Sequence, residues 1–500
     1  MSLTTSEPEQ DRIMEQESDV ARLMESEHAY SSELGSAFQG NSRELLEELP
    51  DNSIDLIVTS PPFALQHKKE YGNEDQEGYN DWFMSFIPEV RRVLQPHGSF
   101  VVEIGGAFKK GYPERSEYQF NLLSRLVDED EGGMHLAQDF YWYNPAKLPN
   151  PIEWVNVRKI RVTDAVTHIW WLTPNINKDS AVEDGEHPHP EASNQRVLQE
   201  YSASQKELLE TGEYNDGKRS SGWNIDSESF ANDNDGSIPD NLIEGFKSDD
   251  VLESLDEFSA KEFIELISNQ DIEEVSAGQL LGMLGMGGRT PDNVIEASNT
   301  ASNTHYLSMC REVEELREKY RKDKIKEIES IVEKEMQCEI EIDIDTDIGN
   351  DENVNDIVEI NVKKQEVDVT EEDALNRTVD IIQEQIENGE LQLDKFREIE
   401  SHPARFPRQI PEFFIDFLTP NPPYNDWDKG VLDSPVVLDI FAGSNLTGMI
   451  AEKKKRHWIA FEKEQNYIET SEFRFRTEEE IKSIETDDQK SLGEFPTVGK

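Results

Sequence analysis

Cysteine is scarce in this chain. Its 500 residues include only Cys310 and Cys338, which is too few for a disulfide framework or a four-thiolate zinc site. The histidine pair His187 and His189 makes only a weak case for a metal, because it brings no complete ligand set at metal-binding spacing. We therefore predict no metal site and an intracellular, reducing location, the cytoplasm.

Long apolar runs are missing too. The sequence contains no run of about 18 or more apolar residues, the length that a membrane-spanning helix needs. Its start, MSLTTSEPEQ, is acidic and has no basic segment leading into an apolar one. The sequence therefore predicts neither secretion nor a membrane partner.

Basic residues are the third deficit. The chain has 49 lysines and arginines against 106 acidic residues, a formal net charge of −57, while 35% of its residues are hydrophobic and 9% aromatic. Enough apolar residues for a folded core together with such an acid excess indicate a salt-adapted, halophilic protein. At molar ionic strength the Debye length falls to about 3 Å, so distant acids hardly affect a local basic patch. The net charge therefore does not exclude DNA as a partner.

Two regions of this acidic chain have the pattern of an α/β fold. The first begins at about residue 34, where apolar strands such as IDLIVTS and VTHIWWL alternate with helices such as DWFMSFIPEVRRVL. The second begins after residue 400 and contains the series VVLDIFAG, NLTGMIAEKKK and HWIAFE, which is a βαβ unit. This alternation predicts a doubly wound sheet of parallel strands.

Acidic, low-complexity segments separate and flank these regions. They are a leader over residues 1–33, a helix-forming segment at about 245–296, a longer segment over 311–400 and a tail over 479–500. We expect the leader to be a helix or a frayed end, and the tail to be mobile. Within the longer segment, EIEIDIDTDI alternates acids with isoleucines, which fits an edge hairpin, the interpretation we favour, or a highly charged loop.

The βαβ unit has the pattern of a nucleotide site. It runs from Val436 to Glu462, and the small residues Ala442, Gly443 and Ser444 follow its first strand. Such a turn lets a ligand approach the backbone at a helix N-terminus, and a carboxylate at the end of the next strand can hold two ribose hydroxyls. Because G-x-G-x-x-G is absent, the cradle for a dinucleotide pyrophosphate is missing, which favours a nucleoside such as S-adenosylmethionine. An ordinary βα turn remains the structural alternative.

A second signal lies at the end of the strand IDLIVT, where Ser60, Pro61, Pro62 and Phe63 follow. Prolines have no N–H, so this pair predicts a rigid, non-helical loop at the carboxyl edge of the sheet. A serine hydroxyl and a proline carbonyl can accept hydrogen bonds from an exocyclic amine while a phenylalanine stacks on the base. A stiff strand terminator would have a similar sequence.

Three motifs together resemble a known family. SPPF after one strand, FAGSN after another and HPARFP at residues 402–407 resemble the β-class amino-methylating DNA methyltransferases. The likeness is greatest to the cytosine-N4-specific type II modification methylases of the Pvu type, which modify CAGCTG. It includes FYWYNPAKLPNPIEWVNVRKIRV and the DGSIP turn. It covers roughly residues 36–171, parts of 215–310, and 401–476, and leaves out the leader, the two acidic segments and the tail.

The resemblance implies a circularly permuted, Rossmann-like sheet of an S-adenosylmethionine-dependent methyltransferase, because the catalytic motif precedes the cofactor motif. It implies a catalytic half over 34–172, a target-recognition region over 173–310 that contains the insertion at 245–296, and a cofactor-binding half over 401–478. The cofactor would be S-adenosyl-L-methionine and the partner double-stranded DNA.

The resemblance also implies roles for individual residues. Ser60, Pro61, Pro62 and Phe63 would be the catalytic set and would receive a flipped base. In the FAGSN motif, Asn445 would line the cofactor with its neighbours, and Thr447 would lie in the helix behind. The cofactor set comprises Asn41, His402, Pro403, Arg405, Phe406, Asp439, Phe441, Gly443, Ser444, Asn445, Thr447 and Glu462.

One position departs from the family pattern. Asn41 stands where the family usually has an aspartate that accepts a hydrogen bond from the adenine amine of the cofactor. An asparagine carbonyl can still accept, so we expect cofactor binding weaker by about 1 kcal/mol rather than lost activity.

Candidates for DNA contact are few. Trp142 either stacks on the flipped base or is a core tryptophan at the end of a strand. Basic islands are conspicuous in so acidic a chain, and they supply the candidates for phosphate contact: Lys68, Lys69, Arg158, Lys159 and Arg161. We interpret the basic run over 453–456 as structural, because cations are favoured at a helix C-terminus.

These patterns predict an enzyme that methylates the N4 amine of cytosine in duplex DNA, as the modification component of a restriction–modification system with a cognate endonuclease. Neither cysteine follows a proline as the covalent nucleophile of a carbon-5 methylase does. One alternative is adenine-N6 methylation by the same fold, although Ser60 favours cytosine because adenine enzymes more often carry aspartate there. Another is a cofactor-binding DNA-recognition protein without catalysis.

Overall fold

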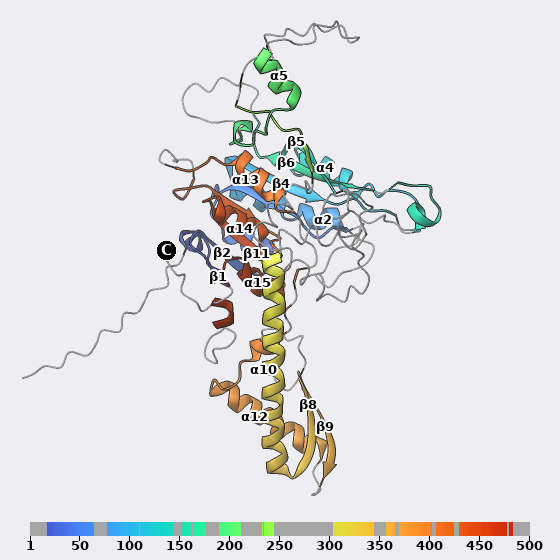
Figure 1. Ribbon diagram of the computed structural model, residues 1–500, viewed down its shortest axis with the longest axis vertical. Coiled ribbons are helices and arrows are strands. Elements are labelled where there is room, and N and C mark those ends of the chain that lie inside the picture. Colours follow the sequence, from blue (N-terminus) through green and yellow to red (C-terminus); the bar gives the residue numbers. More distant parts are fainter. Residues whose placement is uncertain are drawn as a thin grey trace, which may run out of the picture.

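The computed structural model describes residues 18–64, 78–109, 111–144, 153–162, 164–176, 190–211, 235–244, 304–344, 357–365, 370–397, 407–424, 430–477 and 480–483, together with positions 233, 399, 401 and 402. The described chain is organised around one large sheet (Figure 1). Its strands are β1 (Tyr30–Ser31), β2 (Gly35–Gln39), β3 (Ile54–Thr59), β4 (Leu94–Ile104), β5 (His135–Tyr143), β6 (Val166–Thr173), β7 (Leu242–Glu244), β10 (Val436–Asp439) and β11 (His457–Glu462).

The strand order of this sheet is β1-β2-β11-β10-β3-β4-β6-β5-β7. The central strands β2, β11, β10, β3 and β4 are parallel, and β6 runs antiparallel to both β4 and β5. The two C-terminal strands lie between N-terminal ones, with Ala460 opposite Ala37 on one side and Val437 opposite Leu56 on the other. Strands from the N-terminal and C-terminal parts of the described chain therefore form the centre of one sheet, and the predicted permuted α/β fold is confirmed.

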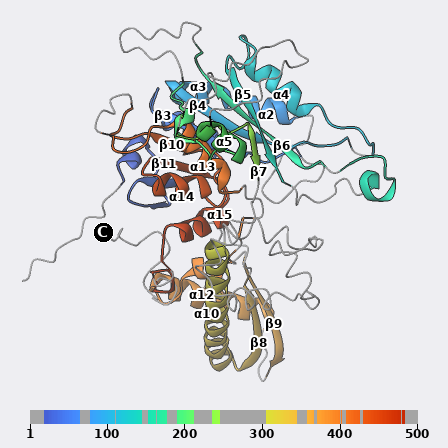
Figure 2. The same ribbon diagram turned by 45° about the horizontal axis from the view of Figure 1, so that its top comes forward.

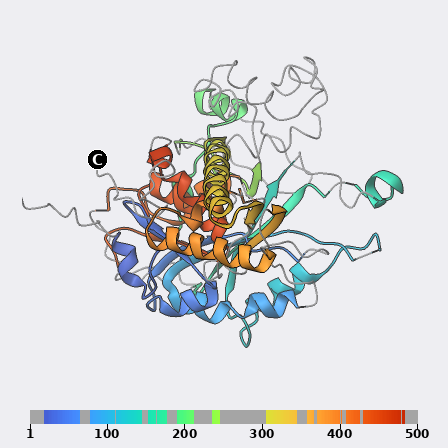
Figure 3. The ribbon, with the colours of Figure 1, turned by 90° about the horizontal axis from the view of Figure 1, so that it is seen from below.

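Helices cover both faces of the sheet. One layer contains α1 (Ser42–Glu48), α2 (Tyr79–Met84), α3 (Ile87–Val93) and α4 (Tyr118–Val127), and the other contains α13 (Gln409–Leu418), α14 (Leu446–Lys453) and α15 (Gln465–Ser471). Figure 3 shows the blue helices of the first layer and the red helices of the second on opposite sides. In β3, Ile54 and Ile57 enter one core while Leu56 and Val58 enter the other. Burial on both faces explains why these strands are continuous apolar runs.

Two sequence-based expectations need correction in the N-terminal half. The segment DWFMSFIPEVRRVL forms two helices, α2 and α3, because Pro88 belongs to the first turn of a new helix and cannot continue an old one. Of the two alternatives for the leader, the helix is met in the described part only over a short 3-10 turn, and the frayed end is wrong for residues 18–33. A 3-10 turn, η1 (Asp19–Leu23), buries Val20, and β1 pairs Tyr30 with Ala37 of β2. Apolar side chains in this acidic stretch therefore anchor it to the main core.

The residues between Thr304 and Arg397 form a substructure that we call the inserted module. It comprises α10 (Thr304–Met336), β8 (Cys338–Ile344), β9 (Val358–Gln365), α12 (Glu371–Glu387) and the 3-10 turn η5 (Leu393–Phe396). Figures 1 and 2 show it extending away from the large sheet. The start predicted at residue 311 falls inside α10, because the helix continues unbroken through the point where the sequence becomes low in complexity.

The predicted edge hairpin in the inserted module is confirmed, but it does not belong to the large sheet. β8 and β9 form an antiparallel sheet of their own. Along β8 the isoleucines are buried against α10 and α12, while Glu339, Glu341 and Asp343 are exposed. This alternation gives the module a separate apolar core and an acidic outer face.

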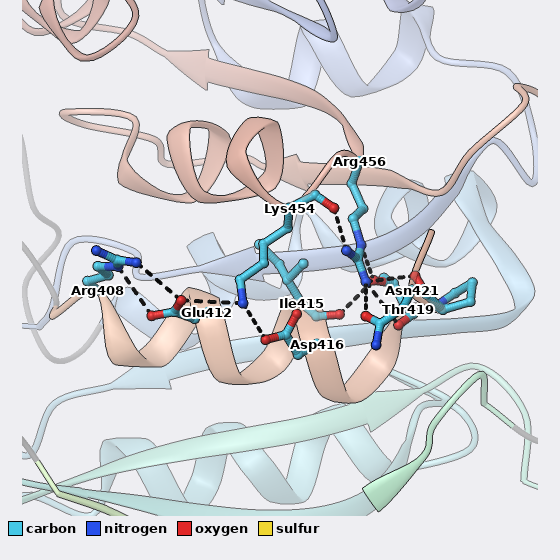
Figure 4. A network of polar contacts seen from close by, with 9 residues as sticks. Arg408, Glu412, Ile415, Asp416, Thr419, Asn421, Lys454 and Arg456 are labelled. Atoms are coloured by element: carbon cyan, nitrogen blue, oxygen red, sulfur yellow. Dashed lines mark hydrogen bonds and ion pairs between the residues drawn. The ribbon is translucent and has the colours of Figure 1, made fainter. Parts of the chain in front are cut away.

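A polar network joins α13 to the end of α14 (Figure 4). Arg456 is almost fully buried and donates to the Thr419 hydroxyl at 2.9 Å and to the Asn421 side chain at 3.0 Å. Lys454 pairs with Asp416 and with Glu412, the latter at 3.3 Å. The structural interpretation of the basic run is thus confirmed for Lys454 and Arg456.

The remaining described elements are a π-helical turn η2 (Glu153–Val157), the 3-10 turns η3 (Asn194–Arg196) and η6 (Glu472–Arg474), and helix α5 (Ala203–Thr211). Among the helices that the structure describes, none combines the length and apolar character needed to cross a membrane. The segment 245–296, the pair His187 and His189, and the tail beyond residue 483 lie outside the described residues.

Candidate active site

A cavity of about 340 Å³ lies at the carboxyl ends of β3 and β10. These strands are parallel neighbours, but the chain continues from β3 to β4 on one side and from β10 to β11 on the other. Such a switch point is where open α/β sheets bind ligands. Ten of the predicted site residues line the cavity: Asn41, Ser60, Pro61, Pro62, Phe63, His402, Phe441, Gly443, Ser444 and Glu462. The structure therefore brings the catalytic and cofactor motifs together.

The catalytic motif forms the loop that follows β3. Pro61 is buried, and Ser60 and Phe63 are partly exposed toward the cavity. The ring of Phe63 lies against Gly105 at the end of β4, where an added Cβ would be only 2.4 Å from the ring. Gly105 therefore makes room for Phe63. Our sequence analysis missed this residue, although the glycine pair after the strand SFVVEI was a visible signal.

The cofactor motif forms a tight turn between β10 and α14. Gly443 has a φ of +51°, in the left-handed region that glycine adopts without strain. A Cβ at this position would also approach the His402 ring to 3.1 Å. Both the turn and the close contact therefore require glycine here.

Glu462 closes this turn from the end of β11. Its carboxylate accepts hydrogen bonds from the backbone N–H groups of Gly443 at 2.7 Å, Lys463 at 2.8 Å and Glu464 at 2.9 Å. Burial raises the pKa of Glu462 from its ordinary value of 4.5 to about 7, against the opposing effect of these three bonds. The carboxylate lines the cavity and is held in place by these three backbone donors.

Asp439 lies behind the cavity and connects the two motifs. Its fully buried carboxylate accepts from the Thr59 hydroxyl at 2.7 Å, the Phe441 N–H at 3.1 Å and the Thr447 hydroxyl at 2.7 Å. Thr59 precedes the catalytic loop and Phe441 begins the cofactor turn, so this one side chain fixes the relative position of both. Burial raises the pKa of Asp439 to about 6.

An aromatic wall covers one side of the cavity. The ring of Phe441 lies 5.6 Å from Trp82 and 5.2 Å from Phe86, measured between ring centroids, and all three line the cavity. Sequence analysis missed Trp82 and Phe86, whose spacing of four residues in DWFMSF places them on the same side of the chain. It also missed Tyr467, a further lining residue whose ring meets His402 edge-on at 4.5 Å.

Asn41 also lines the cavity, and it caps α1. Its side-chain oxygen accepts from the Arg43 N–H at 3.2 Å, and its amide donates to Glu44 at 3.3 Å. The oxygen retains a second lone pair for a ligand. Asparagine and aspartate are equally good caps, so capping does not explain the departure from the family pattern.

Three other predicted residues do not line the cavity. Asn445, expected there, is buried; it caps α14 through the Gly448 N–H at 3.0 Å and donates to the Tyr30 hydroxyl at 2.9 Å. Thr447 lies in the helix behind, as expected, where it bonds Asp439. Trp142 is buried in the apolar core on the α13 side of the sheet. Asn445 and Thr447 therefore support the cofactor turn from behind, whereas Trp142 is a core residue.

The basic candidates that the structure describes lie on an arm between β5 and β6. Arg158 pairs with Glu153 at 2.9 Å, and Arg161 donates to the Pro113 carbonyl at 2.8 Å. Lys159 is exposed and has a left-handed backbone. Lys68, Lys69, Pro403, Arg405 and Phe406 lie outside the described residues.

Comparisons with known proteins agree with this geometry. The family model of N6/N4 methyltransferases, described as DNA methylase, matches residues 54–473. The type II methyltransferase M.PvuII of Proteus hauseri is 34% identical over 449 residues, which cover 89% of this chain and 85% of that protein. The type II methyltransferase M.BamHI of Bacillus amyloliquefaciens is 31% identical over 102 residues, 20% of this chain and 22% of that protein.

Solved structures include a similar chain as well. The PvuII DNA methyltransferase (cytosine-N4-specific) is 29% identical in sequence. The match covers 93% of this chain and 96% of that one, with a TM-score of 0.47.

Proposed function

The chain belongs to the N6/N4 DNA methylase family, and from this membership we propose that it transfers a methyl group from S-adenosylmethionine to the N4 amine of cytosine in duplex DNA. The observation that carries the proposal is the meeting of Ser60–Phe63 with the Gly443 turn and Glu462 in one cavity. The similarity to M.PvuII, whose solved counterpart is described as cytosine-N4-specific, supports cytosine over adenine.

The residues of the cavity fit the cofactor. Glu462 can accept from a ribose hydroxyl, because a carboxylate has about four lone-pair sites and the backbone uses three of them, two on Oε1 and one on Oε2. The aromatic wall offers Phe441 and Trp82 to the adenine ring, and Asn41 offers a carbonyl to the adenine amine. S-adenosylmethionine, when bound, supplies the electrophilic methyl group.

The catalytic loop would hold the target base. A duplex hides the exocyclic amine, so the cytosine is flipped out of the stack to reach the cavity. The Ser60 hydroxyl and the Pro61 carbonyl then accept hydrogen bonds from the amine, which leaves its nitrogen lone pair free to attack, and Phe63 stacks on the ring. Asp439, which accepts hydrogen bonds from both Thr59 and Phe441, fixes the position of this loop relative to the cofactor turn.

DNA would approach along the edge of the sheet at which the catalytic loop lies. β5 ends and β6 begins at this edge, because β6 is antiparallel to both β4 and β5. The arm between them therefore points toward the DNA side, and Arg158, Lys159 and Arg161 are proposed to contact phosphates. Lys159→Ala should lower the slope of log affinity against log salt by about 0.9, whereas the exposed Lys319→Ala on α10 should leave it unchanged.

We propose CAGCTG as the target sequence, on the likeness to the Pvu-type methylases, and a cognate endonuclease that cuts the same site. The enzyme would act in the cytoplasm at high salt. Complete protection of a CAGCTG plasmid from an endonuclease of that specificity, after treatment with the protein, is the expected result. Cleavage that continues despite methylation elsewhere in the plasmid contradicts this target.

The test of the reaction is nucleoside mass spectrometry. Duplex DNA is incubated with the protein and isotope-labelled S-adenosylmethionine in molar potassium chloride, and label is expected in N4-methylcytosine. Ser60→Ala should lose about 100-fold in rate while cofactor binding, measured by calorimetry, is kept. The exposed Ser330→Ala on α10 serves as the matched control and should retain wild-type turnover.

The same experiment separates the alternatives. Label in N6-methyladenine would mean that the target base is adenine, and the assigned fold and cofactor would be unaffected. Cofactor and DNA binding without label in either nucleoside would indicate a recognition protein and contradict the proposed enzyme.

A further inference from the structure

The inserted module begins at the cofactor cavity. Its long helix α10 starts at Thr304 and buries Tyr306, Met309 and Val313 against Phe473, which follows α15. α15 carries Tyr467, a residue that lines the cavity. The first turns of α10 therefore pack directly behind the cavity wall, while the rest of the helix carries the acidic hairpin.

Tyr306 makes the polar contacts of this junction. It is 1% exposed, and its hydroxyl accepts from the backbone N–H of His402 at 3.3 Å and lies 3.1 Å from the Thr470 hydroxyl. The His402 ring in turn contacts Gly443 of the cofactor turn and the ring of Tyr467. One hydroxyl thus connects α10 with two pieces of the cavity wall.

A second route leads from the same ring to the cofactor turn. The guanidinium of Arg474 lies over the Tyr306 ring, 4.4 Å from its centroid. This guanidinium donates to the Ser444 hydroxyl at 2.9 Å and also to the Ser444 carbonyl. Because Ser444 lines the cavity, the stacked pair of Tyr306 and Arg474 supports the turn from behind.

Buried ion pairs hold the module at this junction. Glu469 of α15 accepts from Arg397 at 2.6 Å and lies 3.8 Å from Arg317 of α10. Both arginines are buried, so they fix the direction in which α10 leaves the methyltransferase core. These contacts anchor the root of the module firmly to the cofactor-binding half.

We propose that Tyr306 is a positioning residue of the cofactor cavity, acting through His402 and Arg474, so that the inserted module shapes the site where the cofactor binds. The inference rests on the proposed function, because it concerns binding of S-adenosylmethionine at that cavity. It changes the interpretation of the acidic segment: its exposed acids keep the protein hydrated in salt, but its first helix belongs to the cofactor site.

The test compares two single-atom changes on the same helix. Tyr306→Phe removes the hydroxyl and keeps the ring under Arg474. Tyr320→Phe is the matched control: the Tyr320 hydroxyl accepts from the Gln392 N–H at 2.8 Å, inside the module and away from the cavity. Binding of S-adenosylmethionine to the full chain is measured by calorimetry in molar potassium chloride, with thermal unfolding of every variant recorded.

We expect Tyr306→Phe to raise the Kd for S-adenosylmethionine about fivefold, the effect of one lost hydrogen bond, and Tyr320→Phe to leave it unchanged. In turnover assays, the KM for the cofactor should rise with Tyr306→Phe while kcat and the KM for DNA stay at their wild-type values. Arg474→Gln should weaken binding in the same direction. Because Tyr306→Phe removes only the contact with His402 and keeps the ring under Arg474, the two effects should multiply.

Each other outcome is decisive. A wild-type chain that fails to bind S-adenosylmethionine overturns the proposed function and this inference with it. Wild-type binding with an unchanged Kd in Tyr306→Phe overturns the inference alone. Equal weakening by Tyr306→Phe and Tyr320→Phe also overturns it, because the effect would then come from general loosening of the module.

Discussion

Acidic residues occupy two opposite environments in this molecule. At the carboxyl edge of the large sheet, Asp439 and Glu462 are inside the protein, and each accepts three hydrogen bonds from fixed donors. On the hairpin of the inserted module, Glu339, Glu341 and Asp343 alternate with buried isoleucines and point to solvent. The same side-chain chemistry therefore builds a site in one region and a hydrated surface in the other. Burial, not residue type, makes the difference.

The environments differ in what a lost carboxylate leaves behind. At the sheet edge, removing the carboxylate of Asp439 or Glu462 leaves the N–H and hydroxyl groups that donate to it without an acceptor, which is costly. On the hairpin, water replaces whatever is lost. The contrast leads to four predictions, in order of decreasing effect.

Asp439→Ala should have the largest effect. It leaves the hydroxyls of Thr59 and Thr447 and the Phe441 N–H without their acceptor in a buried place, at a cost of about 3 kcal/mol in the free energy of unfolding. The catalytic loop and cofactor turn also lose their link, so kcat/KM should fall about 100-fold. Urea unfolding and labelled methyl transfer measure the two effects. Asp343→Ala on the hairpin is the control, and a similar loss of stability there would remove the contrast.

Glu462 should make cofactor binding depend on pH. The pKa of Glu462 is raised to about 7, and an ionised carboxylate accepts more strongly from a ribose hydroxyl than a protonated one does. The Kd for S-adenosylmethionine should therefore fall as the pH rises from 6 to 8 and then level off. For stability the sign is opposite: the folded state favours the proton, and this contribution is lost as the pH rises from about 4.5 to about 7. Glu462→Gln should bind about tenfold more weakly, with a flat pH profile between these values. A wild-type profile that is flat as well would show that the carboxylate does not meet the cofactor.

The variant Asn41→Asp tests whether another carboxylate at the sheet edge strengthens binding of S-adenosylmethionine. The new carboxylate should tighten binding of S-adenosylmethionine by up to about fivefold, because it replaces a neutral acceptor of the adenine amine with a charged one. Calorimetry measures the change. Asn41→Gln, which moves the acceptor by one methylene, should bind more weakly than wild type. An inactive Asn41→Asp variant contradicts the assigned role.

The smallest effect is expected on the hairpin. Asp343 lies directly opposite Glu359 in the register of β8 and β9, so two like charges face each other. Asp343→Asn should therefore stabilise the protein by about 0.5 kcal/mol at 0.1 M potassium chloride. At 1 M the Debye length is about 3 Å, and the gain should vanish. Thermal unfolding at both salt concentrations measures the change in stability. An equal gain at both concentrations would exclude charge repulsion as the cause. It would also weaken the proposal of salt adaptation.

The sequence alone located the two motifs and several of the elements. β11 spans the predicted HWIAFE, and the loop at Ser60 and the turn at Gly443 lie where the residues predicted them, because prolines and glycines restrict the backbone locally. Alternation of acids and isoleucines predicted the hairpin for the same reason: a strand exposes every second side chain. Such local rules act over a few residues and can be read without knowing what lies nearby.

Only the tertiary structure decided which residues meet. Asp439 and Asn445 belong to the cofactor motif in sequence, yet the packing places both behind the cavity, where one links Thr59 to Phe441 and the other holds Tyr30. Gly105, Trp82 and Tyr306 gained their roles from neighbours far away in the chain. Burial, the raised pKa of Glu462 and the joining of the inserted module to the cofactor wall depend on contacts between segments that the sequence separates, and no local pattern records them.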